Sequence, residues 1–159
     1  LSQFHLSTPI FGSDLPLEDL TDAYLYWPLH RLVGEGVVRK RNCLIIESYP
    51  GTDTTTRYSL VKTWVVPELN LPVRIEKFDR RGLLVRTINA EKVIRQGQLW
   101  LASVLSIVPA DQSWRSTFTI LRGERGLNIP PDEFSPEHVK RLLNPSPVNK
   151  APVSGRPAS

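Results

Sequence analysis

Seven β-type segments follow one another between residues 31 and 121, and turn sequences rather than helices separate them. Residues 50–53 (Pro-Gly-Thr-Asp) and 79–82 (Asp-Arg-Arg-Gly) are typical turns. Short strands joined by tight turns predict a mainly β fold, a curved antiparallel meander of about seven strands. The expected strands are residues 31–38, 42–49, 58–66, 73–78, 83–93, 99–108 and 114–121.

Some of these segments carry apolar side chains on both faces of the expected sheet. In residues 58–66, Trp64 and Val65 point to opposite faces, and Leu101 and Ala102 do the same in a later strand. Phe118, in contrast, lies on the apolar face of a cleanly alternating strand. Strands that are apolar on both faces are covered on both sides or offer one face to an apolar guest. Periodicity alone leaves both arrangements open.

A short helix is predicted over residues 13–24, before the strands, because Ser13 or Asp14 can cap it and apolar residues recur at helical spacing. Ser135 and Pro136 begin a second predicted helix that ends near residue 143. The apolar face of the first helix contains Leu17, Leu20 and Tyr24.

Chain length and composition predict one packed domain followed by a tail. At 159 residues the chain can bury a sufficient core without a disulfide or a metal. Residues 144–159 hold four prolines and almost no apolar bulk. The expected organisation is a single β domain over residues 1–143 and a disordered tail over residues 144–159.

The net charge of +4 does not follow the pattern of a nucleic-acid-binding protein. The densest basic stretch is the turn-like triplet Arg39, Lys40 and Arg41, and other cations alternate with acids. A weak attraction to anionic lipid headgroups remains open. We therefore expect no nucleic-acid partner.

No group of residues forms a coherent catalytic or metal site. The single cysteine, Cys43, lies in an apolar segment and is expected to be a buried thiol. None of the three histidines has a metal-ligating neighbour at a suitable spacing. Glu18 and Asp19 are interpreted as charges at a helix start. The sequence predicts no enzyme, no metal and no cofactor.

Several segments, in this order, resemble the bacterial outer-membrane lipoprotein-sorting family. Residues 11–20 (FGSDLPLEDL) are similar to its "GSD…EDL" segment, and residues 129–135 (IPPDEFS) to its closing segment. The resemblance extends over about residues 10–143. Its central hairpins are matched by residues 58–64 (YSLVKTW), 71–79 (LPVRIEKFD) and 82–86 (GLLVR).

The resemblance implies a partial half-barrel with helices on its concave face around an apolar cavity. It also implies a non-catalytic periplasmic carrier of lipid or lipoprotein acyl chains, with envelope transport proteins as partners. The first helix is then either a movable cover or a permanent plug of the core. The residues expected to contact the ligand are Leu17, Leu20, Tyr24, Trp64, Leu101 and Phe118.

Family members usually carry further strands and a helix before the "GSD" segment, whereas only about ten residues precede it here. We therefore expect an unpaired sheet edge, which favours homo-oligomers formed by strand addition. The alternative function is a protein-interaction or sensor module of an envelope stress regulator, which uses a related fold.

Overall fold

The computed structural model describes residues 16–121, 123, 128, 130 and 131. The chain divides into two compact units, Leu1–Leu121 and Arg122–Ser159, and the fold described below belongs to the first. The second predicted helix and the Pro-rich tail lie outside the described residues. The single domain over residues 1–143 therefore stays a prediction.

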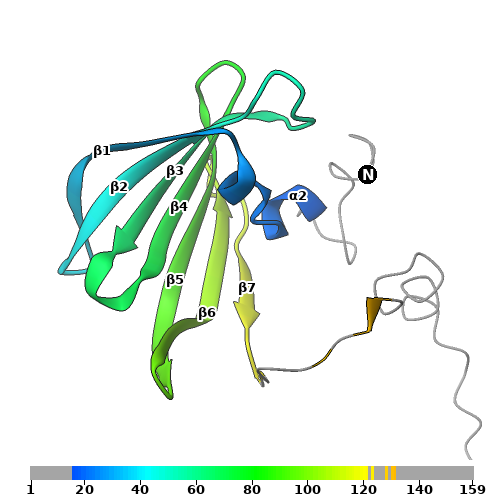
Figure 1. The fold of residues 1–159 in the computed structure, drawn as a ribbon. Coiled ribbons are helices and arrows are strands. Elements are labelled where there is room, and N and C mark those ends of the chain that lie inside the picture. The colour runs from blue at the N-terminus through cyan, green and yellow to red at the C-terminus, as the bar shows by residue number, and fades with distance from the viewer. Residues whose placement is uncertain (1–15, 122, 124–127, 129, 132–159) are drawn as a thin grey trace, which may run out of the picture. The chain divides into compact units, whose positions relative to one another are not determined.

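Seven antiparallel strands form one open sheet in which each strand pairs with its neighbours in the chain (Figure 1). The predicted meander and its mainly β class are confirmed, and the observed strands differ from the expected ones by a few residues at their ends. They are β1 (Leu29–Val38), β2 (Arg41–Tyr49), β3 (Tyr58–Val66), β4 (Leu71–Asp79), β5 (Leu84–Gln96), β6 (Leu99–Pro109) and β7 (Ser116–Thr119).

The turn between β1 and β2 has an unusual backbone. Arg39 and Lys40 both have positive φ, 48° and 66°, which is the pattern of a two-residue type I′ hairpin. Asparagine and glycine normally occupy these positions, because a side chain with a Cβ is strained there. The contacts of the Arg39 side chain with β5, which are described below, offset this backbone strain. The turn after β4 uses Gly82, at φ 76°, in the usual way.

Register shifts change which side chains share a face of the sheet. One shift falls between Tyr58 and Leu60 in β3, and another places Val93 opposite Ala102 after the bulge near Lys92. A bulge adds an unpaired residue and so reverses the alternation beyond it. As a result, Tyr58 packs in one cluster with Val61, which simple alternation would place on opposite faces.

The predicted helix over residues 13–24 is divided into two short pieces, the α-helix α2 (Leu17–Leu20) and the 3₁₀ helix η1 (Ala23–Tyr26). The single continuous helix was therefore wrong. The side chain of Lys77 explains the break, because its Nζ donates to the carbonyl oxygens of Glu18 at 3.0 Å and Asp19 at 3.2 Å. A lysine that binds the last carbonyls of a helix replaces the next helical turn. The expected cap at residue 13 or 14 lies outside the described residues.

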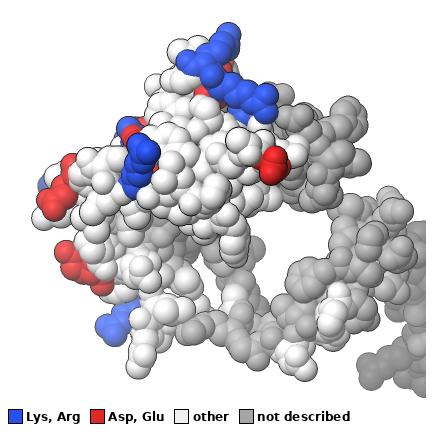
Figure 2. All heavy atoms as spheres, turned by 45° about the horizontal axis from the view of Figure 1, so that its top comes forward, with Lys and Arg blue, Asp and Glu red and all other residues white. Residues whose placement is uncertain are grey.

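Charges on the surface are dispersed. On the face drawn in Figure 2, lysines and arginines stand in small separate groups, with acids and uncharged surface between them. Within the described part of the chain, no helix is both long and apolar enough to cross a bilayer.

The core contains the buried thiol of Cys43, as predicted, and the pKa of this thiol is raised by its burial. At the centre of the sheet, Val61 is fully buried and packs with Tyr24, Trp27 and Tyr58. This cluster joins η1 to β3.

Val61→Ala should lower the free energy of unfolding by about 2–3 kcal/mol, because it removes two buried methyl groups and leaves a cavity. Urea denaturation measures this change. Val37→Ala is the matched control, since Val37 is 67% exposed and its truncation should cost less than about 0.5 kcal/mol. Equal losses in the two variants would contradict this description of the core.

Candidate functional site

Two rows of cross-strand pairs organise one face of the sheet, which we call the inner face. Residues in such pairs stand side by side on the same face. The polar row contains His30, Ser48, Val61, Lys77 and Arg86. The isoleucine row, two residues further along each strand, contains Ile46, Thr63, Ile75, Ile88 and Ile107.

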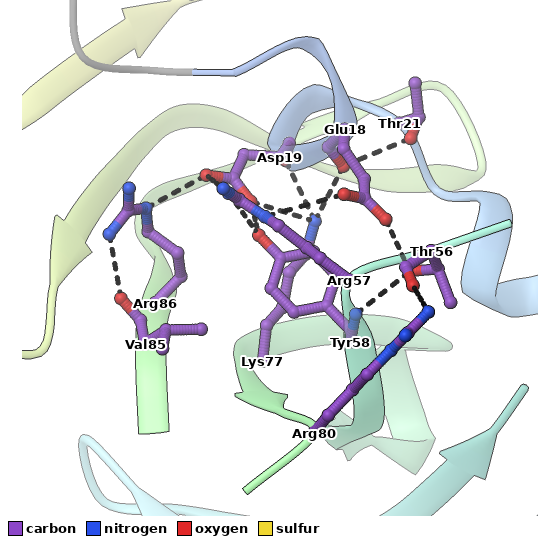
Figure 3. A network of polar contacts seen from close by, with 10 residues as sticks. All are labelled: Glu18, Asp19, Thr21, Thr56, Arg57, Tyr58, Lys77, Arg80, Val85 and Arg86. Carbon is purple, nitrogen blue, oxygen red and sulfur yellow. Dashed lines mark hydrogen bonds and ion pairs between the residues drawn. The ribbon is translucent and has the colours of Figure 1, made fainter. Parts of the chain in front are cut away.

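Asp19 of α2 docks on the cationic end of the polar row (Figure 3). Its side chain is fully buried, and Oδ2 accepts from Arg86 Nε at 2.9 Å and from Arg57 Nη2 at 3.3 Å. Lys77 Nζ lies 3.7 Å from Oδ1, which also accepts from the Tyr58 hydroxyl. Three cations and a phenol thus surround one carboxylate.

The partners of Asp19 are themselves largely withdrawn from water. Lys77 is 2% exposed, and burial lowers the pKa of its ammonium while the nearby Asp19 opposes that shift. Burial and the Asp19 carboxylate raise the pKa of Tyr58. Glu18 completes the network by accepting from the Thr56 hydroxyl. Removing one member of a buried network leaves the others charged and unsatisfied, which costs more than the pair itself contributes.

Asp19→Asn should destabilise the protein by about 3–5 kcal/mol, because it leaves Lys77 and Arg86 without their buried counter-charge. The free energy of unfolding in urea is the measurement. Asp53→Asn, in an exposed turn, is the matched control and should change stability by less than about 0.5 kcal/mol. If both variants unfold at the same urea concentration, the network does not hold α2 on the sheet.

A cavity of about 620 Å³ lies over the inner face. All five residues of the isoleucine row, one on each strand from β2 to β6, line it. The apolar surface is extended by Val65, Leu71, Leu105 and Phe118. Tyr24 and Leu25 of η1 form part of its border. Its size falls within the range of small-molecule sites, roughly 300–1,000 Å³. The predicted apolar cavity is therefore present as a space among the described residues.

A few polar groups face this cavity near η1. His30 Nδ1 and Ser48 Oγ form a hydrogen bond of 2.9 Å, and Asp22 stands close by on the lining. Burial raises the pKa of Tyr24 to about 12, with a contribution from the charge of Asp22. The hydroxyl of Thr63 offsets part of that shift. The cavity thus has a polar end and a longer apolar part.

At the other end of the sheet, Arg39 connects the β1–β2 turn to β5. Its Nη1 donates to the carbonyl oxygens of Ala90 at 3.1 Å and Glu91 at 3.3 Å, and its guanidinium pairs with the Glu91 carboxylate. The pKa of Glu91 is lowered by hydrogen bonds from Ser106 and Arg39. Because β1 and β5 are not neighbours in the sheet, this contact requires strong curvature.

The structure brings two of the predicted ligand-contacting residues, Tyr24 and Phe118, to the cavity. Trp64 stands elsewhere, with the Arg74 guanidinium 5.4 Å from its ring centre. Leu101 is half-buried and also lies away from the lining, because the bulge in the β5–β6 pair turns Ala102 to the inner face. The backbones of Leu17 and Leu20 form α2, and their side chains lie outside the described part.

Sequence reasoning missed the isoleucine row, although a signal for it was present. Once tight turns fix the pairing of neighbouring strands, each residue has a defined partner. Ile46, Ile75 and Ile88 could have been aligned in this way. The bulges prevent the same extrapolation near Leu101. No alternation rule reveals that Asp19 would dock on Lys77, because 58 residues separate them.

A family model matches residues 1–141 and carries the description "Uncharacterized protein", and the chain belongs to that family. None of the curated proteins matches the chain. Solved structures do match it, and three of them follow.

A domain from Vibrio parahaemolyticus, named for outer membrane lipoprotein sorting, has a TM-score of 0.75 at 18% identity and covers 88% of this chain. A DUF1329 family protein from Desulfovibrio piger gives 0.67 at 18% identity over 84% of this chain. A LolA superfamily protein from Nitrosomonas europaea gives 0.63 at 17% identity over 87%. The chain spans 60%, 56% and 61% of their respective lengths. These likenesses establish a shared fold.

Proposed function

We propose that this chain is a non-catalytic binding or carrier domain that takes a lipid or lipoprotein acyl chain into the cavity over its inner face. The main support for this proposal is the isoleucine row, which forms a largely apolar floor across five strands beneath a space of about 620 Å³. Each buried methylene contributes about 0.8 kcal/mol, so one acyl chain provides useful affinity. Tyr24 and Phe118 are the predicted contacts that this proposal retains.

The fold shared with lipoprotein-sorting proteins supports the same proposal. A carrier of this kind would act in the periplasm and exchange its cargo with envelope transport proteins. The acidic and basic groups of the inner face support binding rather than catalysis, since Asp19, Lys77 and Arg86 are used to hold α2. Cargo exchange would then require η1 to move while this network keeps α2 in place.

Ile46→Thr should weaken binding of Nile red, a neutral dye that fluoresces in apolar surroundings, by about tenfold. The reason is the loss of apolar contact in the floor of the cavity, at about 0.8 kcal/mol per methylene. A fluorescence titration measures the affinity. Ile45→Thr is the matched control, because Ile45 is the neighbouring residue, is also half-buried and does not line the cavity.

Native mass spectrometry of the purified chain, with extraction of any bound lipid, tests the same proposal with natural ligands. The acyl-chain proposal would be refuted if the purified chain carried no lipid and also failed to increase the fluorescence of Nile red. Equal weakening by Ile46→Thr and Ile45→Thr would place the dye outside the cavity.

An interaction role is the second candidate, and the outer edge of β1 favours it. Within the described part of the chain, β1 pairs with β2 alone and exposes Leu32, Val33 and Val37. An edge strand with apolar side chains and free backbone groups can accept another strand. We propose that copies of this chain associate through β1, or that β1 receives a strand from a partner protein.

Leu32→Lys should shift the chain toward the monomer, because an edge lysine opposes strand addition. Light scattering over a range of protein concentrations measures the mean mass. Leu83→Lys is the control, since Leu83 is similarly exposed, at 54% against 65%, but lies in the β4–β5 turn. A wild-type chain that stays strictly monomeric at high concentration would exclude self-association.

A further inference from the structure

Thr63 is the one polar residue in the isoleucine row. It stands between Ile46 on β2 and Ile75 on β4, lines the cavity and is only 5% exposed. Its Oγ1 has no hydrogen bond of standard geometry among the described residues, although the Tyr24 hydroxyl lies close enough to interact with it. Buried hydroxyls in folded proteins almost always have a partner. The Thr63 hydroxyl therefore keeps the capacity to pair with a polar group of a ligand in the cavity.

The groups around Thr63 indicate where a ligand would place its polar end. Thr63 lies next to the polar row, close to Tyr24 and near the hydrogen-bonded pair of His30 and Ser48. The apolar lining extends from there toward Leu105 and Phe118 on β6 and β7. A ligand with one polar head and one apolar chain matches this division.

The charges around the cavity restrict the chemistry of the head. Asp22 and Asp19 both line it, and none of the described lining residues is a lysine or an arginine. Lys77 and Arg86 are directed to the Asp19 carboxylate. Since these cations compensate the charge of Asp19, an anionic head would meet the charge of Asp22 without a free cation on the described lining. An uncharged hydroxyl or ester could instead pair with the Thr63 hydroxyl and with its polar neighbours.

We propose that the cavity selects single-chain amphiphiles with an uncharged hydrogen-bonding head, and that Thr63 is the residue that recognises this head. The inference rests on the proposed acyl-chain binding and adds to it the class of head group and the orientation of the ligand. A volume of about 620 Å³ lies within the range of sites that hold a single small molecule, roughly 300–1,000 Å³, which suits one chain with its head.

Displacement of Nile red by three ligands with the same twelve-carbon chain tests this inference. Lauroylglycerol has an uncharged hydroxyl and ester head, laurate has an anionic head, and dodecyltrimethylammonium has a cationic head that cannot form hydrogen bonds. We expect lauroylglycerol to bind at least about tenfold more tightly than laurate to the wild-type chain. It should also bind more tightly than dodecyltrimethylammonium.

Thr63→Val removes the hydroxyl and keeps the shape of the side chain. It should weaken lauroylglycerol about fivefold, the effect of losing one hydrogen bond, and weaken Nile red by a smaller factor. The unfolding midpoint should change little, because the hydroxyl has no hydrogen bond of standard geometry among the described residues. Thr87→Val is the matched control, since Thr87 is a half-buried β5 residue that does not line the cavity.

The outcomes separate this inference from the proposed function. Unchanged lauroylglycerol affinity in Thr63→Val would overturn the role of Thr63, while Nile red binding would leave the acyl-chain proposal standing. Tighter binding of laurate, or of dodecyltrimethylammonium, would overturn the uncharged head as the selected class. A chain that binds neither the dye nor any ligand would refute the proposed function and, with it, this inference.

Discussion

The buried carboxylate of Asp19 is the contact that fixes α2 on the sheet and compensates the cations of the inner face. It pairs with Lys77 and Arg86 on the inner face. Lys77 also donates hydrogen bonds to the carbonyl oxygens of Glu18 and Asp19, which would otherwise bond the next turn of α2. A charge that is removed from water must find opposite charges or hydrogen bonds. The pair of Asp19 and Lys77 therefore both ends α2 and fixes it on the inner face of the sheet.

The inner face is consequently divided in two. The polar row is occupied by the helix, and the isoleucine row beside it remains available as the floor of the cavity. If the cations of the polar row were free, they would attract anionic headgroups. Because they are bound to Asp19, the cavity floor is apolar except for the hydroxyl of Thr63. The anchoring of α2 and the apolar character of the cavity floor are thus two results of the same arrangement.

Much of the sheet could be predicted from the sequence, because hairpins are local. Alternation and turn residues located the seven strands, and the resemblance of residues 11–20 to a known segment indicated the fold. The candidate site was harder to predict from the sequence. All four of Tyr24, Trp64, Leu101 and Phe118 were predicted to contact the ligand, and the structure places Tyr24 and Phe118 at the cavity. Trp64 and Leu101 lie elsewhere, since a shifted register moves a side chain to the other face of the sheet. Glu18 and Asp19 were interpreted as helix-start charges, and only their distant partners show their function.

The order of events during folding follows from where the contacts of α2 lie in the chain. Every strand pairs with its sequence neighbour, so the sheet can grow hairpin by hairpin with small losses of chain entropy. The contacts of Asp19 span 38 to 67 residues and require β3, β4 and β5 to be assembled first. We therefore infer that α2 docks on the sheet after these strands have formed. Because neither α2 nor η1 takes part in the strand pairing, the proposed movement of η1 would leave the sheet intact.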